Sequence, residues 1–192
     1  RYPLVLYGRD RPVPPPHARI LAVDSAGYPA LFQVGPNALG FSGNPGMKPA
    51  IVEAIDKVLG PKALIWKNDS GARELEGLPS YVETALGPDI EETVVEENGV
   101  RFFVPMGHGQ KTGWFYDQAY NRRALLKYVK GARVLDVFSY LGAWGLAAAA
   151  GGAGQVLCVD SSAPALELLQ RSAAANGLHT IRTERADAFD AL

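Results

Sequence analysis

Apolar and polar residues follow clear periods in the second half of the chain. Apolar runs at Val134–Phe138 and Gln155–Val159 have the length of buried strands. Between them, the Ala- and Leu-rich stretch Trp144–Ala150 is typical of a helix that Gly151-Gly152 ends. The order strand, tight turn, helix, strand predicts one βαβ unit of a parallel sheet.

The pattern extends on both sides of this unit. Downstream, it predicts a helix that either Ser161 or Ser162 caps, and then a third strand at Thr180–Glu184. Upstream, it predicts a helix from Asp117 to about Lys130, with an apolar side formed by Ala124, Leu125 and Tyr128.

The first half of the chain has a different organisation. Residues 1–17 hold five prolines, so we expect an extended arm or linker, or the remainder of an upstream domain. Residues 18–105 then predict a small α+β domain. Its elements are a hairpin of Arg19–Val23 and Tyr28–Val34, a helix from Pro49 to Gly60, a strand at Ala63–Lys67, and a second hairpin that turns at Asn98-Gly99.

Composition adds few constraints. The 192 residues are 47% hydrophobic and 20% charged, as in an ordinary soluble protein, and no run has the length of a membrane span. The net charge of −1 indicates no overall basic field, although a local basic patch remains compatible with it. We find no signal peptide and no Cys/His pattern for a metal. Because the chain starts at Arg1 and stops at Leu192 within a pattern, we expect a fragment at both ends.

The turn after the first strand indicates the class of cofactor. Dinucleotide-binding folds place G-x-G-x-x-G here, whereas this chain has bulky Tyr140 and Leu141 and keeps only later glycines. A cofactor without phosphates, such as S-adenosylmethionine, suits this turn better. Asp136 would attract its cationic end, and backbone N–H groups near Gly142 would hold its carboxylate. Alternatively, the unit binds no ligand and Gly142 only permits close packing.

Two further acids follow the next strands. Asp160 lies about 20 residues after the glycine turn, where a carboxylate can accept both ribose hydroxyls. Asp187, followed by Ala188, is placed to accept a hydrogen bond from an adenine amino group. The alternatives are a helix cap at Asp160 and an ordinary loop residue at Asp187.

A second candidate site precedes the parallel sheet. The segment Lys111–Gln118 and nearby Arg122 and Arg123 combine aromatic with basic residues, as nucleic-acid sites often do. The alternative is a helix cap with a solvated basic face. We interpret His108 as an ordinary loop histidine and Cys158, inside an apolar strand, as buried and inert.

Three motifs carry a family resemblance. Residues 109–123 read GQKTGWFYDQAYNRR, residues 133–145 read RVLDVFSYLGAWG, and residues 66–79 read WKNDSGARELEGLP. Over roughly residues 18–192 the chain resembles the bacterial 23S ribosomal RNA 5-methylcytosine methyltransferases of the large-subunit methyltransferase I type. The resemblance implies an N-terminal RNA-binding domain, which we expect to lie outside this sequence. It also implies an α+β central domain at 18–105 and, at 106–192, the first half of a Rossmann-like methyltransferase domain with an incomplete parallel sheet.

The resemblance also implies roles for single residues. The turn Phe138–Gly142 would line the methionine end of S-adenosylmethionine, Asp160 would hold the ribose and Asp187 would meet the adenine. The loop Lys111–Asp117 would wall the pocket, and the family's attacking cysteine is expected beyond Leu192. The predicted cofactor-binding residues are Asp136, Phe138, Ser139, Tyr140, Gly142, Asp160, Ser161, Asp187 and Ala188, and the predicted pocket or RNA residues are Lys111, Thr112, Gly113, Asp117, Gln118 and Arg122.

The resulting hypothesis is an S-adenosylmethionine-dependent methyltransferase acting on cytosine C5 of 23S ribosomal RNA. We expect it in the cytoplasm, without a membrane partner, and leave a homodimer open. Without the distal cysteine, we expect the chain alone to be a poor or inactive enzyme. Two alternatives remain: a noncatalytic RNA-binding or assembly module, and a Rossmann-type oxidoreductase with a nucleotide cofactor.

Overall fold

The computed structural model describes residues 3–8, 19–23, 29–34, 38–41, 48–69, 73, 77–107, 109 and 113–191. The chain forms two compact units. The first comprises residues 1–91 and 105–117, and the second comprises residues 92–104 and 118–192. The sequence predicts three parts, namely an arm, a central domain and a methyltransferase domain. Their boundaries differ from those of the two units, and this division into domains stays a prediction.

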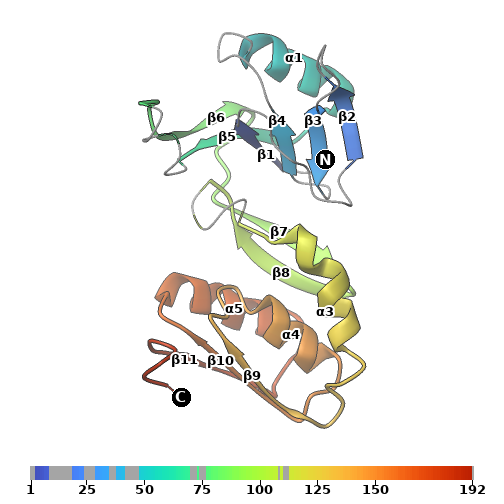
Figure 1. Cartoon of the computed structure of the whole chain (residues 1–192), viewed down its shortest axis with the longest axis vertical. Coiled ribbons are helices and arrows are strands. Elements are labelled where there is room, and N and C mark those ends of the chain that lie inside the picture. The colour runs from blue at the N-terminus through green and yellow to red at the C-terminus, as the bar shows by residue number, and fades with distance from the viewer. Residues whose placement is uncertain are drawn as a thin grey trace. The chain divides into compact units, whose positions relative to one another are not determined.

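A six-stranded sheet forms the body of the first unit (Figure 1). Its interior strand β1 (Pro3–Gly8) pairs in parallel with β4 (Ala38–Phe41) and β5 (Ala63–Asn68). The predicted arm is therefore wrong for Pro3–Gly8, while residues 9–17 lie outside the described residues. A proline is tolerated at the first residue of a strand, and the apolar run after Pro3 is typical of a strand. The remaining strands are β2 (Arg19–Val23), β3 (Pro29–Val34) and β6 (Tyr81–Leu86), and the sheet order is β2-β3-β4-β1-β5-β6.

The core of this unit lies between the sheet and the helix α1 (Lys48–Leu59). Ile51 and Ile55, four residues apart, share one helix face and pack with Leu64 and Trp66 of β5. β5 is buried along its whole length. The predicted hairpin is confirmed by the antiparallel pairing of β2 with β3, and the predicted helix by α1.

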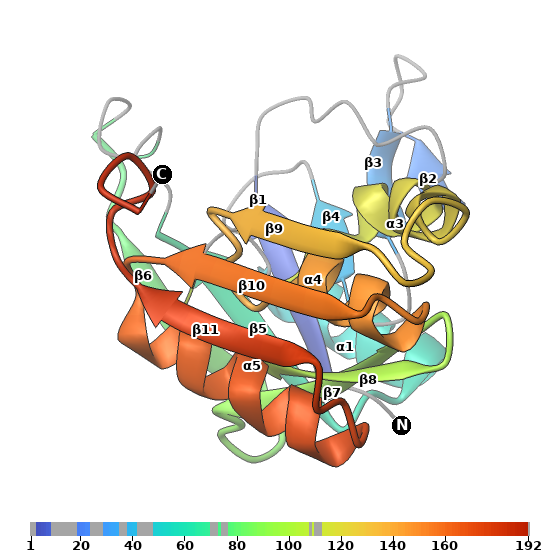
Figure 2. The ribbon, with the colours of Figure 1, turned by 90° about the horizontal axis from the view of Figure 1, so that it is seen from below.

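The second unit contains the predicted parallel sheet. Its three strands lie in the order β11-β10-β9, and α4 and α5 cover one face (Figure 2). Right-handed crossovers place both helices on the same side. Leu141, Leu146 and Leu169 are fully buried beneath them. The elements are β9 (Arg133–Val137), α4 (Ala143–Ala150), β10 (Gln155–Asp160), α5 (Ala163–Ala175) and β11 (Ile181–Arg185).

A hairpin of β7 (Glu92–Glu97) and β8 (Val100–Pro105) also belongs largely to this unit. Side chains of α5 bond to the backbone of β8. Asn176 Oδ1 accepts from the N–H of Arg101 at 3.0 Å, and Asn176 Nδ2 donates to the Arg101 carbonyl at 2.7 Å. Ser172 Oγ accepts from the N–H of Phe103 at 2.9 Å. The two side chains satisfy backbone groups of β8 as a neighbouring strand would.

The helix before the sheet is shorter than predicted. A 3₁₀ turn at Tyr116–Gln118 leads into α3 (Ala119–Leu125), and Gln118 takes the N-cap position that we expected for Asp117. After Leu125 the chain continues in tighter turns, with Tyr128 N–H donating to the Leu125 carbonyl. The helical spacing therefore ends early. Tyr128, predicted on the apolar side, is 78% exposed, and Val129 is buried instead.

Candidate functional site

The turn between β9 and α4 is conformationally strained. Phe138, Tyr140 and Gly142 have φ angles of 56°, 49° and 69°, in the left-handed region. Only glycine adopts this region without cost, and each bulky residue there costs about 1–2 kcal/mol. A Cβ on Gly142 would also lie 2.3 Å from Leu169 Cδ1, so the turn packs tightly against α5. Such strain persists only where surrounding bonds enforce it.

Asp160, at the end of β10, supplies that enforcement. Its Oδ2 accepts from the N–H of Tyr140 at 2.7 Å, and its Oδ1 accepts from the N–H of Ser162 at 2.9 Å. One carboxylate thus joins the turn after β9 to the start of α5. Each oxygen keeps a further lone pair, so the group can still accept from a ligand hydroxyl. The predicted contact with a ribose is compatible with this geometry.

Ser139 lies in the middle of the turn and is 6% exposed. Its N–H donates to the Val159 carbonyl at 3.0 Å. Its Oγ is buried and has no hydrogen-bond partner among the described residues. Because buried hydroxyls are nearly always hydrogen-bonded, this one points to a partner beyond the described residues.

Asp136 faces the helices rather than open solvent. Its Oδ2 accepts from the N–H of Gly145 in α4 at 2.9 Å and lies 3.9 Å from Cys158 Sγ. Burial raises the pKa of the Asp136 carboxyl to about 6, although the bonds from Gly145 and Cys158 oppose the rise. The bond from Gly145 shows that Asp136 holds the first turn of α4. The sequence did not predict this role. The predicted attraction of a cationic cofactor end stays a prediction.

Cys158 is fully buried, as we predicted. Burial, and then the neighbouring Asp136, raise the pKa of its thiol. A thiol that stays protonated is a poor nucleophile. Its Sγ would lie 2.3 Å from a Cβ on Gly145, so the cysteine and the glycine fit together as packing partners.

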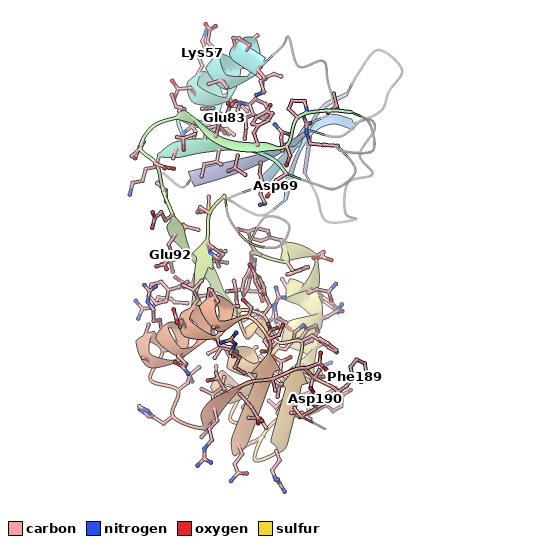
Figure 3. The ribbon with its side chains drawn as sticks, turned by 90° about the vertical axis from the view of Figure 1, so that its left-hand side faces the viewer. Lys57, Asp69, Glu83, Glu92, Phe189 and Asp190 are labelled. Carbon is pink, nitrogen blue, oxygen red and sulfur yellow. The ribbon has the colours of Figure 1, made fainter. Side chains whose placement is uncertain are left out.

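The loop after β11 lies at the same edge of the sheet as the ends of β9 and β10. Asp187 Oδ1 accepts from the N–H of Phe189 at 2.8 Å, and Ala188 between them is buried. The ring of Phe189 meets that of Phe138 at 6.3 Å between centroids, although both are largely exposed. Ser161, next to Asp160, is exposed. Figure 3 labels Phe189 and Asp190 at this end of the chain. The sequence places Phe189 directly after Asp187-Ala188, where an apolar neighbour of the adenine was expected, but it did not predict the contact with Phe138.

The residues of the second candidate set are not brought together within one unit. Lys111 and Thr112, like His108, lie outside the described residues. Gly113 and Asp117 belong to the first unit, whereas Gln118 and Arg122 belong to the second.

Arg122 has a position that sequence reasoning did not foresee. Its Nε and Nη2 donate to the two carboxylate oxygens of Glu97 in β7 at 2.6 and 2.7 Å. Arg122 is 1% exposed, so this bidentate pair fixes α3 to the hairpin. The predicted role at a pocket or RNA stays untested, but this placement favours a structural role.

A comparison with known families decides the class of protein. A model described as S-adenosylmethionine-dependent methyltransferase matches residues 77–184, more than half of the chain. The chain belongs to this methyltransferase family. The match confirms the predicted family and the predicted cofactor class, and it does not support a nucleotide-cofactor oxidoreductase.

Individual methyltransferases show the same similarity. Ribosomal RNA large subunit methyltransferase I of Photobacterium profundum is 36% identical over 91% of this chain and 46% of its own length. SMU.776, described as a methyltransferase complexed with SAH, matches with TM-score 0.70 at 24% identity, over 91% of this chain and 46% of that one. A protein of Streptococcus mutans described as a methyltransferase of this family matches with TM-score 0.67 at 26% identity, with the same coverage.

These matches confirm the predicted fold class, an α+β part followed by an incomplete Rossmann-like sheet. The chain spans just under half the length of these relatives. Within the described residues, no helix is both long and apolar enough to cross a membrane.

Proposed function

We propose that this chain binds S-adenosyl-L-methionine where β9, β10 and β11 end, as the cofactor-binding part of a ribosomal RNA methyltransferase. The observation that supports this most is the strained turn Phe138–Gly142, which Asp160 holds by the N–H of Tyr140. Family membership supplies the cofactor class, and the names of relatives supply the RNA class.

The residues present fit the parts of this cofactor. Ser139 Oγ, which is buried without a described partner, donates to the cofactor carboxylate. The free lone pairs of Asp160 accept from the ribose hydroxyls, and the exposed Asp187 accepts from the adenine amino group. When bound, the cofactor supplies a methyl group on a positively charged sulfur. Because it carries no phosphate, bulky Tyr140 does not obstruct it.

The substrate is the finer part of the proposal. Relatives are named for large-subunit ribosomal RNA, which supports 23S ribosomal RNA as the substrate and the cytoplasm as its location. Methylation at cytosine C5 rests on the motif resemblance described above. That chemistry needs a thiolate, and Cys158 does not supply one because it is buried and its thiol pKa is raised. No catalytic residue is therefore assigned within this chain, and a homodimer stays a prediction.

Calorimetric titration with S-adenosylhomocysteine tests the cofactor site. We expect saturable binding by the chain, and about tenfold weaker binding or worse for Asp160→Asn, because the new amide N–H group would face a backbone N–H. Asp190→Asn is the matched control, since this exposed acid follows the same edge of the sheet (Figure 3). Equal weakening by both variants would show a general charge effect.

The two alternative functions give different results in the same instrument. Binding of NAD in preference to S-adenosylhomocysteine would favour an oxidoreductase. Binding of RNA without any binding of S-adenosylhomocysteine would favour a noncatalytic module, and the proposed cofactor site would then be abandoned. Methyl transfer to a 23S ribosomal RNA fragment, measured with a longer chain that contains the expected cysteine, tests the reaction itself.

A further inference from the structure

An uninterrupted basic segment includes α3 and the turns that follow it. From residue 118 to residue 135 the chain has five basic residues and no acidic one, although its net charge is −1. A local field of positive charge therefore exists within a nearly neutral protein. The cofactor turn Phe138–Gly142 follows the end of β9, whereas this segment ends within that strand.

Four of the five basic residues are exposed, and Arg122 is the exception. Tyr120 and Arg123 lie three positions apart in α3, on one side of the helix, and Lys127, Tyr128 and Lys130 follow in the turns after Leu125. Tyr120 and Tyr128 are 79% and 78% exposed. Arg122 points the opposite way and is buried, and α3 lies beside α4 on its inner side (Figures 1 and 2). We call this surface the α3 patch; it consists of Tyr120, Arg123, Lys127, Tyr128 and Lys130.

The charges of the α3 patch are uncompensated within the described part of the chain. Arg123, Lys127 and Lys130 are exposed, and none of them forms an ion pair with a described carboxylate. Arg122, one residue away, shows the contrast because Glu97 neutralises it. Two large exposed aromatic rings near cations without ion pairs are unusual on a solvated face, since exposing apolar ring area to water is unfavourable.

We propose that the α3 patch binds single-stranded segments of the RNA substrate, with its cations on phosphates and its tyrosines stacked on bases. The proposal rests on the proposed function only for the choice of RNA as the polyanion. Lysine and arginine match the phosphate backbone, and stacking on tyrosine tolerates any base. The patch therefore supplies affinity and orientation, while the choice of nucleotide is made elsewhere.

The test measures binding of a labelled stem-loop of 23S ribosomal RNA by fluorescence anisotropy over a series of salt concentrations. For the triple variant Arg123→Gln, Lys127→Gln, Lys130→Gln, we expect the slope of log affinity against log salt to fall by about 2. For Tyr120→Ala with Tyr128→Ala, we expect about tenfold weaker binding or more at every salt concentration. The pair Tyr120→Phe and Tyr128→Phe keeps the rings and should bind nearly as the unchanged chain.

The matched control removes three other exposed cations, by Lys57→Gln, Lys62→Gln and Arg182→Gln, and should leave the salt slope almost unchanged. Equal loss in this control would overturn the proposal, since net charge alone would then explain binding. So would normal RNA binding by the triple variant, or no RNA binding by a chain that still binds S-adenosylhomocysteine. Normal binding by the tyrosine-to-alanine pair would show a general polyanion surface and refute base stacking. If the unchanged chain did not bind S-adenosylhomocysteine at all, the proposed function would be refuted instead.

Discussion

The two strand-to-helix junctions of the parallel sheet are built differently. After β10, Ser162 has an extended backbone, its Oγ accepts from the N–H of Ala165, and Pro164 sits in the first turn of α5. After β9, Gly142 begins α4 in the left-handed region without any side-chain cap. The β10–α5 junction follows the preferences of an isolated helix start, whereas the β9–α4 junction departs from them.

The difference shows where conformational strain is concentrated. The β9–α4 junction depends on partners distant in sequence, namely Asp160, Leu169 and the Val159 carbonyl. The β10–α5 junction is capped by its own residue Ser162, and from outside the Arg185 side chain donates to the Ser161 carbonyl at 3.3 Å. A strained backbone held from outside is expected where geometry serves a ligand, so the comparison supports the first junction as the cofactor site. The next four experiments test this contrast.

The largest effect is expected at Gly142. Gly142→Ala combines a left-handed alanine with a clash against Leu169, and we expect a loss of about 3 kcal/mol in the free energy of unfolding. Gly177→Ala is the control, because Gly177 has a similar φ of 65° but open space around its Cα. Urea unfolding followed by circular dichroism compares them. Equal losses would mean that packing against α5 contributes nothing.

Asp136→Asn should stabilise the protein at neutral pH. Burial raises the pKa of this carboxyl to about 6 in the folded chain, against an ordinary value of 3.8. Between these values the unfolded chain releases its proton first, so rising pH lowers the stability of the unchanged protein, and above about 6 the loss is constant. The amide can still accept from Gly145.

We therefore expect the Asp136→Asn variant to be more stable above pH 6 by on the order of 2 kcal/mol, with the difference fading towards pH 4. Thermal unfolding in buffers across this range measures it. A difference that does not change with pH would contradict the raised pKa.

Ser139→Ala should change stability and affinity in opposite directions. The variant removes a buried hydroxyl without a described partner, so we expect the protein to gain about 0.5–1 kcal/mol of stability. Binding of S-adenosylhomocysteine should weaken by about five- to tenfold, since a hydrogen bond to the ligand is lost. Calorimetry and thermal unfolding on one sample measure both. Unchanged affinity would remove Ser139 from the site.

The smallest effect is expected at the ordinary junction. Ser162→Ala removes the side-chain cap of α5, whose bond to the N–H of Ala165 is long at 3.4 Å. We expect a loss of about 0.5–1 kcal/mol and no change in S-adenosylhomocysteine binding. Hydrogen exchange of the first α5 amides is the suitable measurement. A marked loss of affinity would show that this junction also shapes the cofactor site.

The sequence predicted those elements whose pattern is local. The βαβ unit with its helix α4, the following helix α5 and the Asn98-Gly99 turn were found because hydrophobic period and turn residues act over short stretches. The strand Pro3–Gly8 was missed, since its partners β4 and β5 are distant in sequence and the nearby prolines dominated the interpretation.

The candidate site was predicted by position but not by contact. The ends of β9, β10 and β11 were expected to carry it, because strands of a parallel sheet end at one edge. The bond from Tyr140 to Asp160 and the buried side of Asp136 were not foreseen, since each depends on the left-handed turn. Arg122 was assigned to a pocket from its place in the basic and aromatic motif. Its pairing with Glu97 was not foreseen, because Glu97 lies 25 residues earlier.

The bonds from Ser172 and Asn176 to β8 have a practical consequence for dividing the chain. A protein produced from residue 106 onward, at the boundary that the sequence suggests, would lose β7 and β8 while keeping α5. Ser172 and Asn176 would lose their partners in β8 and Arg122 would be left buried without Glu97, so insoluble material is the expected product. Expression from residue 92 preserves these partners, so we expect a separately folding cofactor-binding piece to begin one hairpin earlier than its motifs do.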